Sequence, residues 1–211
     1  FESDVVVEFQ PAEPLFDKNL LRIPEIRDEE GVSVACQLEQ ESSSIADDWR
    51  KRVCFHALIP AGRMNRFSCR LHEVPRYPAE VKALPHNFRF RTDRVDIEID
   101  PATGLLCGYE VDGIPFIKKG VSRRVLKDYP DPWGMLVCRF DKSIGDFVLM
   151  SPEESASFAG VEAVRLAPVR IIEEGPVRVI VEALFRYSHS SVCVRYILPR
   201  AGAAIGLDIR V

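Results

Sequence analysis

The residues best suited to chemistry lie in the segment 128–134, which reads Asp-Tyr-Pro-Asp-Pro-Trp-Gly. An aromatic ring can stack on a sugar ring, a carboxylate can accept hydrogen bonds from sugar hydroxyls, and prolines reduce the ordering cost of binding. The sequence therefore predicts a sugar-facing loop, with Trp133 as the apolar anchor and Tyr129 and Asp131 as the polar groups. A second interpretation stays open, in which the loop is rigid and Trp133 fills the edge of a core.

Three carboxylates at alternating positions, Asp96, Glu98 and Asp100, are a second candidate because paired carboxylates can act as acid and base. They alternate with Val95, Ile97 and Ile99. This period of two predicts a strand with one buried face and one wet face. We therefore expect the three carboxylates to lie on a solvated surface.

Glu182 lies inside the longest strand-like run of the chain, where a buried carboxylate needs a cationic partner. Arg178, Arg186 and Arg195 are available on the same run and its continuation. We expect a structural ion pair here. Glu173 and Glu174 precede the Gly-Pro corner that opens the run.

Histidines and cysteines show no ligand spacing, so no catalytic or metal-binding residue is assigned. The chain also lacks serine-nucleophile patterns, phosphate-binding glycine loops and dinucleotide fingerprints. His56 lies in an apolar strand and is expected to be a core residue with a hydrogen-bond partner. The four histidines and six cysteines are His56, His72, His86, His189, Cys36, Cys54, Cys69, Cys107, Cys138 and Cys193.

The composition and net charge of the chain indicate which classes of partner it can bind. The 211 residues are 46% hydrophobic with a net charge of −4, and no basic stripe suggests nucleic acid or an anionic membrane. No apolar run is long enough to span a bilayer. Scattered cysteines inside apolar runs, and the lack of an Asn-x-Ser/Thr acceptor, predict reduced thiols and a cytoplasmic location. The chain starts at Phe1 and ends at Val211 within an alternating run, from which we expect a piece of a longer protein.

Short alternating segments separated by turn residues predict an all-β fold, a small β-sandwich followed by part of a large antiparallel β-sandwich. The first domain is expected over residues 1–75, with strands near 5–7, 20–26, 32–36, 53–59 and 67–71; Pro24 is expected to interrupt the second of these. Pro75, Pro78 and Pro85 predict a linker over residues 76–86. The second domain is expected over residues 87–211.

The second domain is organised around a long hairpin over residues 177–198, entered through the corner Gly175-Pro176 and turned at residues 188–191. Glycine is expected at the corner because it permits an unusual backbone angle. Further strands are expected over residues 95–100, 105–111, 136–140 and 147–150, with tight turns at residues 100–104 and at Asp112-Gly113. Residues 151–158 are expected to form one helical turn.

Four segments, in this order along the chain, show a resemblance to a known family. They are Gln37 with residues 49–55 and Ile59-Pro60, residues 93–104, residues 131–134, and residues 171–178 with Ser188 and residues 196–198. Together they resemble glycoside hydrolase family 38, the α-mannosidases. In that family the first corresponds to a small sandwich, the second to the start of the large β-domain, the third to an Asp-x-Trp segment of bacterial members, and the fourth to a Glu-x-Gly-Pro-Val-Arg hairpin.

The resemblance implies a retaining exo-mannosidase that acts on mannose-containing oligosaccharides. Its catalytic aspartate and its zinc ligands, Asp and His, lie in an α/β barrel that has no counterpart in this sequence. The chain would then be the non-catalytic β-region that supports the barrel and lends the 128–134 loop to the sugar pocket. We expect the chain alone to be inactive on aryl mannosides, with or without zinc.

Two other functions stay open. A free-standing carbohydrate-binding or adhesion module should show an exposed aromatic platform, and a mutarotase-like β-enzyme should bring two histidines and a glutamate to one cleft. We also expect residues 203–211 to form an edge strand with an apolar face, including Ile205, Leu207 and Ile209. Such an edge favours self-association.

Overall fold

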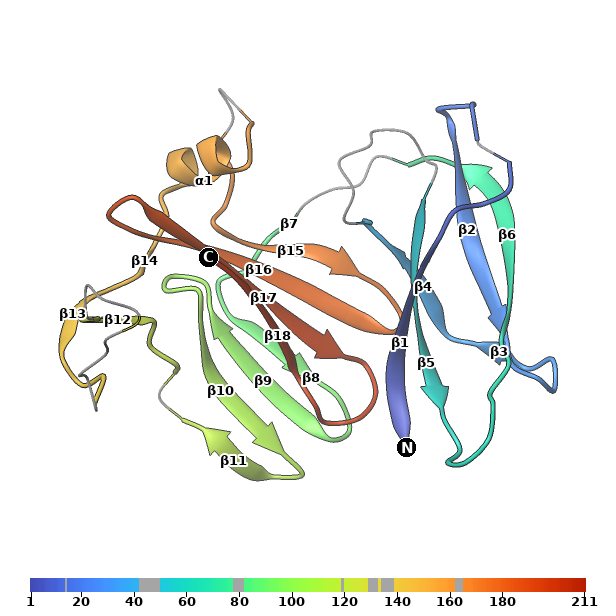
Figure 1. The fold of residues 1–211 in the computed structure, drawn as a ribbon, viewed down its shortest axis with the longest axis horizontal. Coiled ribbons are helices and arrows are strands. Elements are labelled where there is room, and N and C mark those ends of the chain that lie inside the picture. The colour runs from blue at the N-terminus through green and yellow to red at the C-terminus, as the bar shows by residue number, and fades with distance from the viewer. Residues whose placement is uncertain are drawn as a thin grey trace. The chain divides into compact units, whose positions relative to one another are not determined.

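The computed structural model describes residues 1–13, 15–41, 50–77, 82–118, 120–128, 133, 139–161 and 165–211. In these ranges the chain is all-β, with antiparallel strand pairs and one short helix, as predicted (Figure 1). The chain divides into two compact units. The first comprises Phe1–Val81, Ile172–Ile180 and Ile197–Ile205; the second comprises Lys82–Ile171, Val181–Tyr196 and Gly206–Val211. The linker expected at residues 76–86 and the domain limits on either side of it stay a prediction.

The first unit contains two three-stranded sheets. One has the order β1 (Glu2–Phe9), β5 (Lys51–Leu58), β4 (Cys36–Glu39), and the other has the order β3 (Ser33–Val34), β2 (Leu20–Arg27), β6 (Ser68–Pro75). Both sheets supply its core, because Ile26 comes from β2 and Val53, Phe55 and Ala57 come from β5. The small β-sandwich expected from the alternating pattern is therefore present.

Pro24 does not interrupt β2, contrary to expectation. It lies opposite Leu71 of β6, and on its other side β3 pairs only with Ile26 and Arg27. Proline lacks an N–H, but it breaks no ladder on the side where no strand pairs with it.

The second unit contains a four-stranded sheet and a short two-stranded ribbon. The sheet has the order β11 (Ile114–Ile117), β10 (Leu105–Val111), β9 (Val95–Asp100), β8 (Phe88–Arg91), and the ribbon pairs β12 (Arg124–Leu126) with β13 (Ser143–Asp146). Val95, Ile97 and Ile99 are buried on one face of β9, as the period of two predicted. No alternating pattern in the sequence predicted this ribbon.

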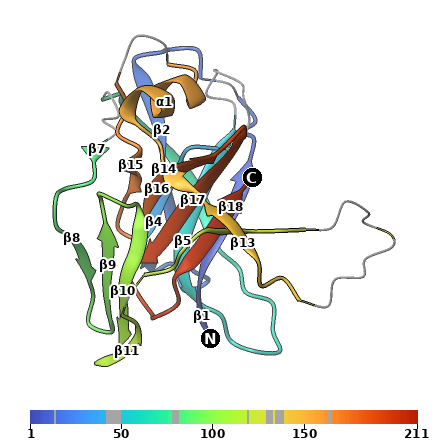
Figure 2. The same cartoon turned by 90° about the vertical axis from the view of Figure 1, so that its left-hand side faces the viewer.

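A six-stranded sheet contains the predicted long hairpin. Its strands are β18 (Gly206–Arg210), β17 (Ser190–Pro199), β16 (Arg178–Tyr187), β15 (Val169–Glu174), β7 (Lys82–Ala83) and, paired with β16, β14 (Val148–Leu149). Figures 1 and 2 show β17 between β16 and β18. The strands β15, β16 and β17 each run from one unit into the other.

The strand β18 stands at one end of this sheet order, as expected for an edge strand. Its apolar side chains Leu207 and Ile209 are 52% and 59% exposed, and Ile205, just before it, is partly buried. These side chains are therefore not covered by the described chain. Self-association through them stays a prediction.

The turn between β9 and β10 forms as predicted. The Asp100 carboxylate accepts hydrogen bonds from Ala102 N at 2.9 Å and Thr103 Oγ1 at 2.7 Å. Gly104 has φ +67°, and an added Cβ would lie 2.9 Å from atoms of Leu149 and Phe185. Glycine is required there both by the backbone angle and by the space. This turn therefore packs against β14 and β16.

The helix α1 (Pro152–Phe158) begins at a capping box. Ser151 Oγ accepts from Glu154 N at 3.2 Å, and the Glu154 carboxylate accepts from Ser151 N at 2.8 Å. The helix is longer than the single turn expected. Of the strand expected over residues 136–140, residues 136–138 lie outside the described ranges. No helix in the described part of the chain has the length and apolar character needed to cross a membrane.

Candidate functional site

Of the three predicted sugar-binding residues, the structure describes Trp133. Its side chain is 97% exposed. Tyr129 and Asp131 lie outside the described residues. The exposure of Trp133 contradicts the alternative interpretation, in which this indole fills the edge of a core.

The ribbon β12–β13 holds the two ends of the segment that contains Trp133. Lys127 N donates to Lys142 O at 2.8 Å just beyond the last pair of the ribbon, so residues 127 and 142 lie side by side. Trp133 therefore lies in the segment whose two ends this ribbon joins.

Arg123 fixes the start of this ribbon. Its Nη2 donates to Tyr196 Oη and, at 3.4 Å, to Gly104 O, and its guanidinium carbon lies 3.6 Å from the centre of the Phe185 ring. Phe147 N donates to Arg123 O at 2.9 Å. Burial lowers the pKa of Arg123, and its buried Nη1 has no hydrogen-bond partner among the residues that the structure describes. The cation–π contact with Phe185 offsets part of the cost of this burial.

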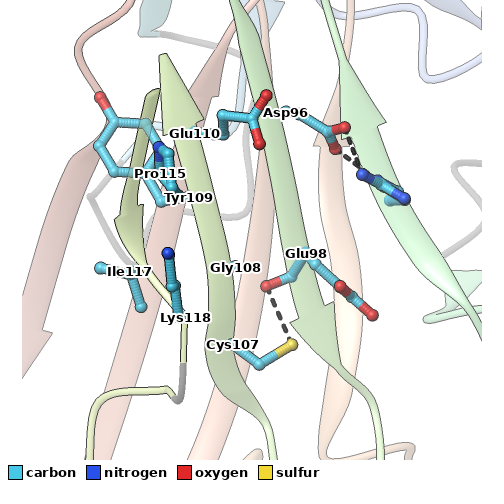
Figure 3. A pocket seen from close by; sticks show the side chains of 10 residues that line it. Asp96, Glu98, Cys107, Gly108, Tyr109, Glu110, Pro115, Ile117 and Lys118 are labelled. Atoms are coloured by element: carbon cyan, nitrogen blue, oxygen red, sulfur yellow. Dashed lines mark hydrogen bonds and ion pairs between the residues drawn. The ribbon is translucent and has the colours of Figure 1, made fainter. Parts of the chain in front are cut away.

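A shallow pocket of about 240 Å³ lies on the face of the four-stranded sheet that carries the alternating carboxylates (Figure 3). Strands β8 to β11 and the residue after β11 supply its lining: Arg89, Asp96, Glu98, Cys107, Gly108, Tyr109, Glu110, Pro115, Ile117 and Lys118. Sequence reasoning placed Asp96 and Glu98 on this face and did not identify the pocket.

Asp96 is not simply solvated, contrary to the expectation for the three carboxylates. Its two oxygens accept from Arg89 in a bidentate pair, and Arg91 Nε donates to it at 2.9 Å. The hydrogen bond from Arg89 holds the pKa of Asp96 below its usual range. The Asp100 carboxylate accepts hydrogen bonds within the turn between β9 and β10, and the hydrogen bond from Thr103 lowers the pKa of Asp100. Neither group is therefore poised to exchange protons near neutral pH, while the Glu98 side chain is exposed.

Gly108 gives the pocket its floor. It pairs with Glu98, whereas the preceding Cys107 has no partner in the register because β10 bulges there. A Cβ added to Gly108 would lie 3.2 Å from the Glu98 Cβ. The glycine therefore leaves a hollow that any other side chain would begin to fill. An isolated glycine inside a strand pattern is the sequence signal that could have indicated this bulge.

Glu182 has the ion pair that the sequence predicted. Of its two partners, Arg195 was among the predicted arginines and Arg170 was not. Arg195 Nε donates to its Oε2 at 2.9 Å, and Arg170 of β15 pairs with its Oε1. The Cys193 thiol contacts the same carboxylate at 3.4 Å. Arg178 and Arg186 pair instead with Glu39 and Glu154. The Glu182 cluster is buried and internally satisfied, so its geometry supports a structural role.

Two of the four histidines, His56 and His72, pair with carboxylates on neighbouring strands. His56 is half-buried rather than a core residue, and its Nδ1 lies 2.9 Å from Asp4 Oδ1; His72 Nε2 lies 2.9 Å from Glu25 Oε2. In the ranges that the structure describes, no three His, Cys, Asp or Glu side chains group as metal ligands would. The cysteines in those ranges carry free thiols.

The site candidates are thus two: the loop that presents Trp133, and the sheet-face pocket over Gly108. The first has an exposed aromatic ring, and the second has hydrogen-bonding groups of both kinds around a hollow. Comparison of the sequence with models of protein families and with curated proteins found no match.

Proposed function

We propose that this chain is the non-catalytic β-region of an α-mannosidase-like glycoside hydrolase of family 38, and that the loop containing Trp133 contributes to sugar binding. The proposal is carried by one observation, the full exposure of the Trp133 indole. A largely exposed tryptophan forgoes most of the free energy of burial that such a large apolar side chain normally gains. Stacking on a sugar ring would recover it.

The order of the four segments that resemble the family supports this assignment, as does the all-β fold. The large hairpin β16–β17 and the small sandwich are the elements that the resemblance leads one to expect. The catalytic aspartate and the zinc ligands would lie in the barrel of the enzyme. No zinc site is proposed for this chain, because the resemblance places the ligands in the barrel. The cytoplasmic location predicted from the cysteines belongs to the same proposal.

The test compares the gene product at its natural length with the 211-residue chain on an aryl α-mannoside, with and without Zn²⁺. The natural-length protein should hydrolyse it and the 211-residue chain should not. In the natural-length protein, Asp131→Ala should raise KM or lower kcat by about tenfold or more, because a hydrogen bond from a sugar hydroxyl to a charged group is lost. Trp133→Ala should also impair the kinetics. Phe16→Ala, which removes an exposed ring of the first unit, is its matched control and should leave the kinetics unchanged.

The second candidate is a free-standing carbohydrate-binding module, which the same exposed indole favours. Under this alternative the natural-length protein would bind mannosides and hydrolyse none, and Trp133→Ala would abolish binding. A mannosidase activity unaffected by Asp131→Ala and Trp133→Ala would contradict the assigned role of the loop.

A further inference from the structure

We propose that the sheet-face pocket over Gly108 is a second saccharide site, which binds a single neutral pyranose ring. It shares no residue with the Trp133 loop and does not depend on the function proposed above. The inference rests on how strands β9, β10 and β11 arrange donors, acceptors and apolar atoms around a hollow (Figure 3).

The register of β9 and β10 brings the polar groups to one face. Glu98 lies opposite Gly108 and Asp96 lies opposite Glu110, and residues directly opposite each other share a face. Two carboxylates on neighbouring strands, Glu98 and Glu110, thus flank a position that has no side chain. Among the described residues neither carboxylate has a hydrogen-bond or ion-pair partner, whereas Asp96 is bound by Arg89 and Arg91.

The other wall comes from β11 and the residue that follows it. Lys118 supplies an ammonium group without a partner in the described structure, and Pro115 and Ile117 supply apolar atoms. A second irregularity in the ladder lies between β10 and β11, where Tyr109 faces Ile117 and Glu110 faces Pro115, so that Phe116 of β11 is left without a partner in the register. Bulges of this kind re-aim side chains and are frequent beside binding sites.

The chemistry of the lining selects the ligand. Ionised carboxylates only accept hydrogen bonds and an ammonium group only donates them, whereas a sugar hydroxyl does both. Glu98 and Glu110 disfavour an anion, and Lys118 disfavours a simple cation, while the charge of Arg89 is compensated by Asp96. The C–H face of a pyranose can lie against Pro115 and Ile117. A neutral polyol is therefore the class that satisfies all these groups.

The size of the hollow limits the ligand to one ring. Pockets for drug-sized ligands usually measure about 300–1,000 Å³, and this one measures about 240 Å³ and is open to solvent. We expect millimolar affinity, since a shallow open site buries little of its ligand.

The test is an NMR titration of the ¹⁵N-labelled full chain with methyl α-mannoside, methyl β-glucoside and methyl β-galactoside. At least one should give saturable shifts of the Gly108, Glu110 and Lys118 amides. Glu110→Gln should weaken that binding by about tenfold, as expected for loss of a charged acceptor, and Gly108→Ala should weaken it by filling the hollow. Asp112→Asn is the matched control. It makes the same acid-to-amide change in the turn between β10 and β11, outside the pocket lining, at an exposed pair with Arg94 and at a φ of +50° that asparagine tolerates.

Three results would overturn the proposal: no saturable shift with any of the glycosides, unchanged affinity in Glu110→Gln, or tighter binding of spermidine than of any sugar at the same amides. The test also separates the two sites. If Trp133→Ala abolishes binding while Glu110→Gln preserves it, the loop binds the sugar and the pocket does not. If Glu110→Gln weakens binding while Trp133→Ala has no effect, the pocket is the site whatever the role of the loop.

Discussion

Arg178 and Glu39 form a buried bidentate ion pair across 139 positions of the sequence. Arg178 Nε and Nη2 each donate to a different carboxylate oxygen of Glu39 at 2.6 Å, and the two side chains are 7% and 2% exposed. Gln37 completes the cluster: its Nε2 donates to Glu39 at 3.0 Å, and its Oε1 accepts from Val177 N and Arg178 N, each at 3.0 Å. The first residues of β16 are thereby fixed to β4 within the first unit.

Removing one partner of this pair should destabilise the protein strongly, because a buried charge would be left without compensation. We expect Glu39→Gln or Arg178→Met to lower the free energy of unfolding by about 3–5 kcal/mol. The double replacement Glu39→Leu with Arg178→Met should recover part of the loss, since neither charge of this pair is then left buried without the other. Urea unfolding of the three variants measures this. Arg27→Met, at an exposed pair with Glu25, is the control and should cost about 1 kcal/mol or less. Equal losses at the two arginines would contradict the prediction.

Gly175 shows how a correct sequence signal can have a different physical cause. The Gly175-Pro176 corner was predicted because glycine permits unusual backbone angles, but Gly175 does not have a positive φ. Glycine is needed here because a side chain would collide with Gln37: an added Cβ would lie 2.7 Å from Gln37 Cδ and 2.9 Å from Gln37 Cβ. The close approach comes from a residue more than a hundred positions away, so no local pattern could show it.

Most strands could be predicted because apolar and polar residues alternate along each strand, and this period of two shows which side chains are buried. In β9, Val95, Ile97 and Ile99 face the core, and in β16 and β17 the apolar run is long enough to predict the hairpin. The pocket could not be predicted in this way. It depends on the pairing of Glu98 with Gly108, on a bulge in β10 at Cys107 and on a bulge in β11 at Phe116, which are properties of strand register. Likewise, Glu182 was expected to need a cation, but its partner Arg170 comes from a neighbouring strand.

Two buried thiols should make the stability of the protein depend on pH in the alkaline range. Burial raises the pKa of Cys54 to about 12 and that of Cys193 to about 11, with the Glu182 carboxylate as a further cause for Cys193. A thiol freed by unfolding ionises near its ordinary value of 9.0. The unfolded state therefore loses protons that the folded state keeps, and the free energy of unfolding should fall as pH rises from about 9 toward 11.

Urea unfolding at intervals from pH 8 to pH 10.5 measures this fall. The double variant Cys54→Ala, Cys193→Ala should be less stable at pH 8 because it leaves cavities, but its stability should change less with pH than that of the parent chain. Cys69→Ala is the control: burial also raises the pKa of this exposed thiol, but less than those of Cys54 and Cys193, so its removal should flatten the dependence less. A double variant that loses stability with pH as steeply as the parent would show that these two thiols do not cause the dependence.

Trp133 should be dispensable for folding, because its side chain is 97% exposed. We expect Trp133→Ala to change the free energy of unfolding of the 211-residue chain by less than about 0.5 kcal/mol, as is usual for surface substitutions. Leu184→Ala is the contrasting variant: this leucine is fully buried, with Met150 and Cys193 in its cluster, and its truncation should cost about 2–5 kcal/mol. Thermal and urea unfolding measure both. If Trp133→Ala lowers the free energy of unfolding as much as Leu184→Ala does, the indole is part of a core, and the proposal that it binds a sugar ring loses its basis.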